Sequence, residues 1–88
     1  MRRITALEIP SNAIVIDIRD DLERAVKPLL LESVAICLAE LEDGNPSLPN
    51  APLVVVCSTG RQSEYAGALL ETLGATDVLL LEFGAQSL

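Results

Sequence analysis

One segment sets the architecture of this 88-residue chain: Leu53-Val54-Val55-Val56-Cys57-Ser58-Thr59-Gly60-Arg61-Gln62-Ser63. Its first four residues are apolar, three of them are β-branched, and no polar residue interrupts them. Such a run is typical of a strand that is covered on both faces, as in the middle of a parallel sheet. Polar residues and a glycine follow the cysteine at once, so the strand is expected to end in a tight loop.

A helical pattern follows this loop. The helix is predicted to run from about Gln62 to Leu73 and to end at Gly74. Its apolar face is expected to comprise Tyr65, Leu69, Leu70 and Leu73. The order of strand, loop and helix places the loop at the carboxyl end of a parallel strand, which is where ligands bind in α/β proteins.

The rest of the chain alternates short strands with short helices. Strands are predicted over residues 2–4, 13–18, 34–38 and 78–81, a helical turn over residues 6–8, and helices from Asp20 to about Pro28 and over residues 39–42. This alternation predicts one α/β domain over residues 1–88, a small three-layer domain with a mainly parallel central sheet flanked by short helices.

Three details of this prediction concern particular segments. The first helix is expected to bury a stripe of apolar side chains, at Leu22, Val26 and Leu29 or Leu30. Cys37 is expected as a buried residue inside the strand over residues 34–38, and a resolving thiol is its alternative role. Residues 44–52, which are rich in proline, are expected to form a rigid surface connection.

Cys57 stands at the point where the central strand gives way to the loop. A loop that curls into the first turn of a helix directs backbone N–H groups inward, and the amino terminus of the helix adds partial positive charge. Both effects favour an anion and lower the pKa of a thiol, so Cys57 is predicted to react as a thiolate. The alternative is an unreactive cysteine that serves as a small apolar strand residue.

The same loop resembles the active-site loop of the rhodanese homology domain, which is commonly written C-x-x-G-x-R-S. Cys57, Gly60 and Ser63 match this pattern. Gln62 stands in place of the family's arginine, and Arg61 lies one position earlier.

Other segments of the chain are similar to the same family. Val15-Ile16-Asp17-Ile18-Arg19 is close to its V-I-D-V-R motif, and the run from Leu73 to Gln86 is similar to its G-x-x-x-V-x-x-L-x-G-G ending. Residues 35–41 look like its A-x-x-I-P-L-x-E-L segment, whereas its H-I-P-G-A motif is absent. The resemblance therefore covers most of the chain, most strongly from Leu53 onward.

This resemblance implies a rhodanese-like fold and a thiosulfate-type sulfurtransferase. Cys57 would be the catalytic nucleophile, taking the outer sulfur of thiosulfate or a similar donor and passing it from a persulfide to a thiol or to cyanide. The implied substrate-binding residues are Ser58, Thr59, Gly60, Arg61, Gln62 and Ser63. The amides of residues 58–62 would cradle the persulfide, and Arg61 would orient the anionic donor.

Asp17 and Arg19 are implied as supporting residues beside the active-site loop. Sulfur transfer requires no acid at the position of Asp17, so a carboxylate that caps a loop is its simplest role. The residues and the resemblance imply no cofactor.

Two other functions remain open. A persulfide carrier or binding module that receives sulfur from a partner protein fits the missing loop arginine and the acidic composition, because an acidic surface slows anion capture and steers basic partners. A phosphatase or arsenate reductase would need an arginine where this chain has Ser63, to hold a tetrahedral oxyanion.

Composition argues against several further classes of function. The net charge of −7 and the scarcity of aromatic residues make nucleic acid an unexpected partner. Arg61 is the one cation beyond Lys27, which favours an anionic ligand at the loop. The chain has no histidine, and its two cysteines lack a metal-binding spacing, so no metal site is predicted.

The expected location is the cytoplasm, where thiols stay reduced. No apolar run is long enough to span a bilayer, and the residues after Met1 do not form a signal-peptide core, so no membrane association is expected. The expected partners are a small sulfur-donor anion, a thiol or cyanide acceptor and, under the carrier hypothesis, a protein of a sulfur relay.

Overall fold

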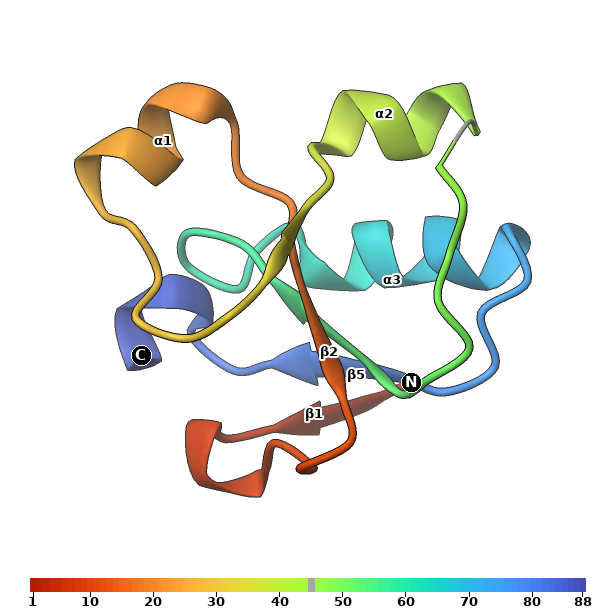
Figure 1. Ribbon diagram of the computed structural model, residues 1–88, viewed down its shortest axis with the longest axis horizontal. Coiled ribbons are helices and arrows are strands. Elements are labelled where there is room, and N and C mark those ends of the chain that lie inside the picture. Colours follow the sequence, from red (N-terminus) through yellow and green to blue (C-terminus); the bar gives the residue numbers. More distant parts are fainter. Residues whose placement is uncertain (45) are drawn as a thin grey trace.

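Five parallel strands form one sheet in the computed structural model, which describes residues 1–44 and 46–88 (Figure 1). The order across the sheet is β1-β5-β4-β2-β3, so β4 lies at its centre. The strands are β1 (Arg2–Ile4), β2 (Ile14–Asp17), β3 (Val34–Ala35), β4 (Leu53–Val56) and β5 (Val78–Leu81). The predicted α/β class with a parallel central sheet is confirmed, and β4 is the strand that opens the decisive segment.

Short helices and 3₁₀ turns connect these strands. In the described part of the chain they are η1 (Ala6–Glu8), α1 (Asp21–Val26), α2 (Leu38–Asp43), α3 (Ser63–Thr72) and η2 (Gly84–Ser87). Asp20 caps α1, because its carboxylate accepts a hydrogen bond of 2.8 Å from the Glu23 N–H. None of the helices described here combines the length and the apolar character needed to cross a bilayer.

The register of the two inner strands brings their carboxyl ends to the same edge of the sheet. Asp17 at the end of β2 lies opposite Val56 at the end of β4. The Ile18 N–H then donates to the Val56 carbonyl over 3.0 Å, which extends the pairing by one residue. The segments that follow β2 and β4 therefore emerge side by side at this edge, and they carry the candidate site residues.

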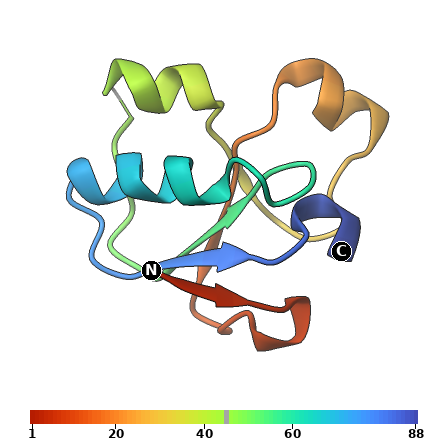
Figure 2. The ribbon, with the colours of Figure 1, turned by 180° about the vertical axis from the view of Figure 1, so that it is seen from behind.

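Alternate residues of β4 serve two separate hydrophobic clusters, as the pleat of a strand requires. Leu53 and Val55 pack with side chains of α2 and α3 on one face. Val54 and Val56 belong to a cluster on the opposite face. That opposite face is covered by the 3₁₀ turns and connecting segments, through Ala6, Ile9, Leu29, Leu31, Ala85 and Leu88. Figure 2 shows the same layers from behind, with α2 and α3 on one side of the sheet and β1 and η1 at its far edge.

Helix α3 packs through Leu69, Leu70 and Leu73 as predicted, but Tyr65 does not belong to the packed face. Its buried residues are Ser63, Ala66, Gly67 and Leu70. A Cβ at Gly67 would lie 2.9 Å from a methyl group of Leu80, so the small residues bring the helix close to β5. Tyr65 was expected on the apolar face, but it is 50% exposed, and its hydroxyl donates to Glu42 of α2 over 2.8 Å.

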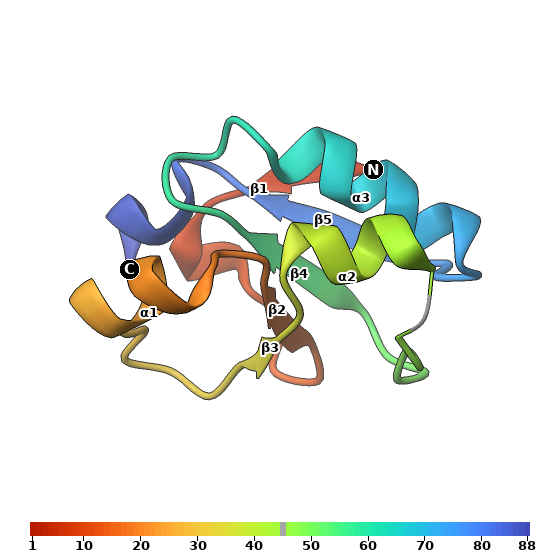
Figure 3. The same cartoon turned by 90° about the horizontal axis from the view of Figure 1, so that it is seen from above.

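Helix α1 does not bury its predicted apolar stripe. Leu22 is 73% exposed and Val26 is 77% exposed, and no residue of this helix is buried. The physical reason is its position: α1 lies beyond the carboxyl edge of the sheet, beside η2 and the loop after β4, and not over a sheet face (Figures 1 and 3). Of the two alternatives for the end of the stripe, Leu29 is half-buried, whereas Leu30 is exposed.

Cys37 lies at the amino end of α2 and not inside a strand. Strand β3 ends at Ala35, and Cys37 is the half-buried residue that precedes the first helical turn, with its carbonyl accepting from the Leu41 N–H over 3.2 Å. The predicted strand was too long because the helix starts at Leu38. Gly44 ends the helix with a φ of +73°, as its residue type favours. The connection predicted over residues 44–52 includes Asn45, which lies outside the described residues.

Candidate functional site

The sulfur of Cys57 lies inside the loop that joins β4 to α3. The Gly60 N–H donates to Sγ over 2.8 Å, and the hydroxyl of Ser63, the first residue of α3, lies 3.3 Å from Sγ. Cys57 is only 2% exposed and Ser63 is fully buried. The loop thus surrounds the sulfur with donors, which is the arrangement expected from a strand that turns directly into a helix.

Two opposing effects act on the pKa of Cys57. Burial is the larger single effect, and it raises the pKa because it disfavours the thiolate. The Ser63 hydroxyl and the backbone N–H groups of Gln62, Gly60 and Thr59 favour the thiolate, and together they outweigh burial. The net result is a pKa below that of an ordinary thiol. This is the chemistry of a nucleophile in a nest of donors.

The loop keeps its shape through close contacts with the segment after β5. Gly60 has a φ of +92°, a conformation that favours glycine. A Cβ on Gly84 would lie 2.2 Å from the Cys57 carbonyl oxygen, so only glycine fits there. The same carbonyl accepts the Ala85 N–H over 2.7 Å. Gly84 and Ala85 therefore fix the backbone of Cys57, a role that sequence reasoning did not assign, although both fall in the family-like ending.

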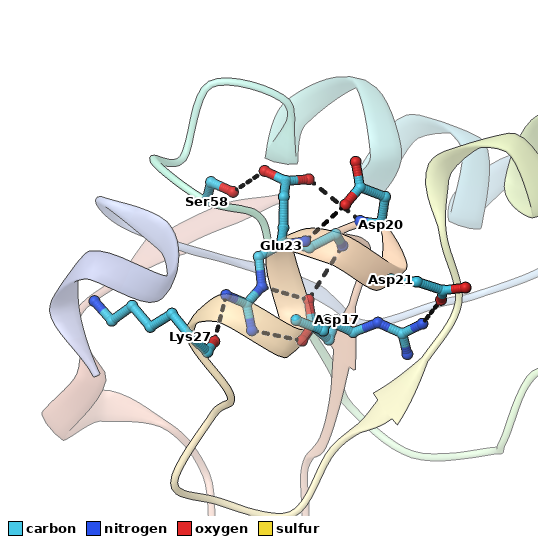
Figure 4. Close-up of polar contacts among 8 residues, drawn as sticks. Asp17, Asp20, Asp21, Glu23, Lys27 and Ser58 are labelled. Atoms are coloured by element: carbon cyan, nitrogen blue, oxygen red, sulfur yellow. Dashed lines mark hydrogen bonds and ion pairs between the residues drawn. The ribbon is translucent and has the colours of Figure 1, made fainter.

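Asp17 and Arg19 form a buried ion pair next to this loop. Arg19 donates from Nε and Nη2 to the two carboxylate oxygens of Asp17, both over 3.0 Å (Figure 4). The pair is almost fully enclosed. The hydrogen bond to Asp17 raises the pKa of Arg19 in spite of this burial. The structure therefore places both residues beside the site as a fixed pair and not in contact with the Cys57 sulfur.

Arg19 also connects this pair to helix α1. Its Nη1 donates to the Lys27 carbonyl over 2.8 Å, at the carboxyl end of the helix (Figure 4). The amino half of the same helix contacts the cysteine loop, because the Ser58 hydroxyl donates to the Glu23 carboxylate. The other oxygen of Glu23 accepts the Asp20 N–H over 3.2 Å. Glu23 is thus hydrogen-bonded both to the start of its own helix and to the loop, and no local sequence pattern indicated its contact with the loop.

A cleft of about 450 Å³ opens between α1 and the cysteine loop. Loop residues Ser58 and Thr59, which follow Cys57 directly, form one wall, and α1 forms the other. A second cleft of about 470 Å³ lies at the opposite end of the sheet, by Met1 and Asp77, and no cysteine lines either cleft. Of the two, the cleft beside α1 is the one that borders the loop holding Cys57, and we call it the α1 cleft.

The remaining loop residues lie at the surface. Thr59, Arg61 and Gln62 are exposed, and Arg61 makes no hydrogen bond or ion pair with any residue that the structure describes. Arg61 is also absent from the lining of the α1 cleft. The loop therefore brings the backbone N–H of Gly60 and the hydroxyl of Ser63 to the sulfur. Its one cation, Arg61, has no partner within the described residues. Across residues 1–44 and 46–88, no three side chains of the metal-ligating types gather closely enough to hold an ion.

Solved structures of other proteins share this fold. A rhodanese homologue from the extremely thermophilic bacterium Thermus thermophilus is 31% identical, with a TM-score of 0.82 over 99% of this chain and 100% of that chain. A rhodanese-related protein from Thermoplasma volcanium is 26% identical, with a TM-score of 0.84 over 99% of this chain and 89% of that one. An NAD-dependent persulfide reductase from A. fulgidus shares the fold at 24% identity and a TM-score of 0.75, over 97% of this chain and 15% of its own length. No protein-family model matches the chain, and no curated protein matches it by sequence.

Proposed function

Because this chain belongs to the rhodanese family, we propose that it is a sulfurtransferase that carries sulfane sulfur as a persulfide on Cys57. The observation that supports this most directly is the sulfur of Cys57 inside a ring of donors, 2.8 Å from the Gly60 nitrogen and 3.3 Å from the Ser63 oxygen. A thiolate so stabilised is a nucleophile at neutral pH. The donor is thiosulfate or a similar sulfane-sulfur compound.

The proposed reaction has two steps. In the first, the Cys57 thiolate attacks the outer sulfur of thiosulfate, an S–S bond to Cys57 forms, the S–S bond of thiosulfate breaks, and sulfite leaves with the electron pair. In the second, an acceptor such as cyanide or a thiolate attacks the outer sulfur of the persulfide and releases the Cys57 thiolate. Neither step requires a general acid or base, which fits a chain without histidine.

The donors around Cys57 serve both forms of the sulfur. Backbone N–H groups that stabilise the thiolate also lie where a terminal persulfide sulfur would carry negative charge. Ser63 is buried and fixed on the first turn of α3, so its hydroxyl is positioned before substrate arrives. Such preorganised donors lower the barrier without reorganisation during the reaction.

A second candidate function is a persulfide carrier that exchanges sulfur with a partner protein and uses thiosulfate poorly. The charges around the cysteine favour it. Gln62 supplies no charge at the family's arginine position, and Arg61 lies outside the lining of the α1 cleft, whereas the Glu23 carboxylate lines it. A phosphatase or arsenate reductase is less well supported, because Ser63 contacts the sulfur where such enzymes need a cation for the oxyanion.

The proposed setting is the cytoplasm. Both cysteines are free thiols, Cys57 buried and Cys37 half-buried, and a sulfur carrier needs a compartment in which thiols stay reduced. The partners we propose are a small sulfur donor, a thiol or cyanide acceptor, and a relay protein under the carrier function. Nucleic acid is not proposed, given the net charge of −7.

Replacement of Cys57 tests the proposal. Cys57→Ser should abolish formation of thiocyanate from thiosulfate and cyanide and leave the fold intact, because the substitution removes the nucleophile with little change in size. Cys37→Ser is the matched control and should retain the activity, since Cys37 lies at the start of α2. Activity that survives in Cys57→Ser and is lost in Cys37→Ser would show that the site is assigned wrongly.

A further inference from the structure

The α1 cleft combines two features that the proposed reaction does not explain. The first is apolar: Leu22 and Val26 stand one helical turn apart on α1, both mostly exposed, and both line the cleft. Two large aliphatic side chains that are adjacent, exposed and on the wall of a cleft form an apolar surface that can contact a ligand. Their position beside Ser58 and Thr59 puts that ligand against the loop that holds Cys57, although Cys57 itself does not line the cleft.

The second feature is the charge at the cleft. Three charged side chains line it, those of Arg19, Glu23 and Lys27. Arg19 is neutralised by the Asp17 carboxylate at 3.0 Å. In Figure 4 the Lys27 side chain extends away from Ser58, whereas the Glu23 carboxylate is directed at Ser58, to which it is hydrogen-bonded. Among the charged side chains that line the cleft, the one in contact with the cysteine loop is therefore negative and is held in place.

We propose that the α1 cleft is the subsite for the body of the substrate, and that it selects sulfane-sulfur compounds with an apolar group that is uncharged or cationic over small dianions. Leu22 and Val26 contact the apolar group, and Glu23 determines the charge preference. The proposal rests on the proposed function and names the substrate class of that site. The corresponding donor is an organic persulfide with such a group.

The chemical step with this donor is balanced without a further reagent. The Cys57 thiolate attacks the outer sulfur of R–S–SH, the new S–S bond to Cys57 forms, and the S–S bond of the donor breaks. The thiolate R–S⁻ leaves with the electron pair, and the transferred sulfur keeps its proton. In this scheme the Glu23 carboxylate disfavours a donor with two negative charges, such as thiosulfate, about twice as strongly in free energy as a donor with one.

Methanethiosulfonate reagents test the charge preference without any turnover. Each reagent transfers a group R–S to a thiolate and releases the same methanesulfinate, so only R differs between reagents. In a Cys37→Ser background, Cys57 is labelled with the 2-(trimethylammonium)ethyl reagent and with the 2-sulfonatoethyl reagent at low salt, and the ratio of the two rate constants is measured. This ratio cancels any change in the thiolate fraction of Cys57.

Glu23→Gln should lower the cation-to-anion ratio by roughly three- to tenfold, because it removes one charge near the reacting sulfur, and added salt should shrink the difference. The glutamine oxygen can still accept the Asp20 N–H, and the glutamine NH2 group can donate to the Ser58 hydroxyl oxygen. Glu71→Gln is the matched control, since Glu71 lines the cleft at the opposite end of the sheet and the same charge is lost. Its ratio should equal that of the parent.

The apolar feature is tested with the benzyl and methyl reagents of the same series. Leu22→Ser combined with Val26→Ser should lower the ratio of the benzyl to the methyl labelling rate constant by about threefold or more, because contact area for the benzyl ring is lost. Leu7→Ser is the control, an equally apolar residue that is 99% exposed and lies outside the cleft.

Two results would overturn the subsite. One is a cation-to-anion ratio that is unchanged by Glu23→Gln or that changes equally in Glu71→Gln. The other is an absence of labelling at Cys57 with every reagent, since the cleft would then give no access to the sulfur. Labelling with the expected ratios in a protein that transfers no sulfane sulfur would refute the proposed function and leave the subsite standing.

Discussion

Ser63 connects the sulfur of Cys57 to the first turn of helix α3. Its hydroxyl lies 3.3 Å from Sγ, and both residues are buried, so water does not replace this contact when it is removed. Ser58 belongs to the same loop, but its hydroxyl donates to Glu23 and not to the sulfur. The two serines therefore form a natural pair for separating loop structure from thiolate stabilisation.

Ser63→Ala should raise the pKa of Cys57, because a hydrogen bond to the thiolate is lost while burial remains. The pKa of Cys57 is measured in a Cys37→Ser background, from the rate of alkylation by iodoacetamide as a function of pH. The parent protein should show a midpoint below about 8.5, the value of a free thiol. Ser58→Ala should leave the midpoint in place. Equal shifts in both variants would mean that Ser63 has no special part in stabilising the thiolate.

The lowered pKa also links stability to pH. A group whose pKa is depressed in the folded state adds stability above its unfolded pKa and loses it as the pH falls through the folded pKa. The native state should thus gain stability relative to Cys57→Ser as the pH rises toward about 8.5, and no further beyond it. Urea denaturation of the two proteins across this range would show the difference.

Arg61 is the cation nearest to Cys57 in sequence and has no partner within the described residues. Arg61→Ala should slow persulfide formation from thiosulfate by about tenfold, the low end for a charge-assisted hydrogen bond, since the side chain is exposed. Stability should change by less than about 0.5 kcal/mol. An unchanged rate would show that Arg61 does not contact the donor.

A swapped loop separates the two candidate functions. Arg61→Gln combined with Gln62→Arg moves the cation to the family's usual position. A large gain in thiosulfate use would indicate that the native loop is not built for small anions and would favour the carrier function. Comparable or lower use, together with a clear loss in Arg61→Ala, would favour donor binding by Arg61.

At the scale of elements, the buried Asp17–Arg19 pair joins β2 to the end of α1. Arg19→Met leaves the Asp17 carboxylate enclosed without a partner and frees the Lys27 carbonyl. The free energy of unfolding should fall by about 3–5 kcal/mol, as measured by urea denaturation. Asp17→Leu combined with Arg19→Met should recover much of this loss, because no charge is then left buried.

Arg3→Met provides the comparison for an exposed ion pair. Arg3 contacts Glu64 at 3.3 Å with both side chains largely in solvent, so its loss should cost about 0–1 kcal/mol. Equal losses in Arg3→Met and Arg19→Met would contradict the view that the buried pair holds α1 beside the cysteine loop.

At the scale of the whole molecule, sequence reasoning succeeded where the signal was local. The unbroken apolar run of β4 identified the central strand, and the polar residues after it identified the loop. The place of Cys57 at the strand end followed from the same segment, whereas Gly60 and Ser63 were implied by the resemblance of the loop to that of the rhodanese family.

Sequence reasoning failed where a contact depends on residues that are far apart in the chain. A pair of apolar residues at Leu22 and Val26 has the same spacing whether it packs on a sheet or lines a cleft, and only the position of α1 distinguishes the two. Tyr65 fits an apolar helical face, but the small Ala66 and Gly67 set the contact with the sheet. The contact between Glu23 and Ser58 joins residues 35 positions apart, so no short pattern contains it.

Sulfur bound to Cys57 is the most direct test of the whole account. The protein is incubated with thiosulfate and, separately, with the cationic persulfide of cysteamine, and its peptides are then analysed by mass spectrometry under conditions that preserve persulfides. We predict one added sulfur atom on the peptide that contains Cys57, at higher occupancy with the cationic donor, and none in Cys57→Ser. Cys57 left unmodified by both donors, or sulfur found on Cys37 instead, would contradict the account.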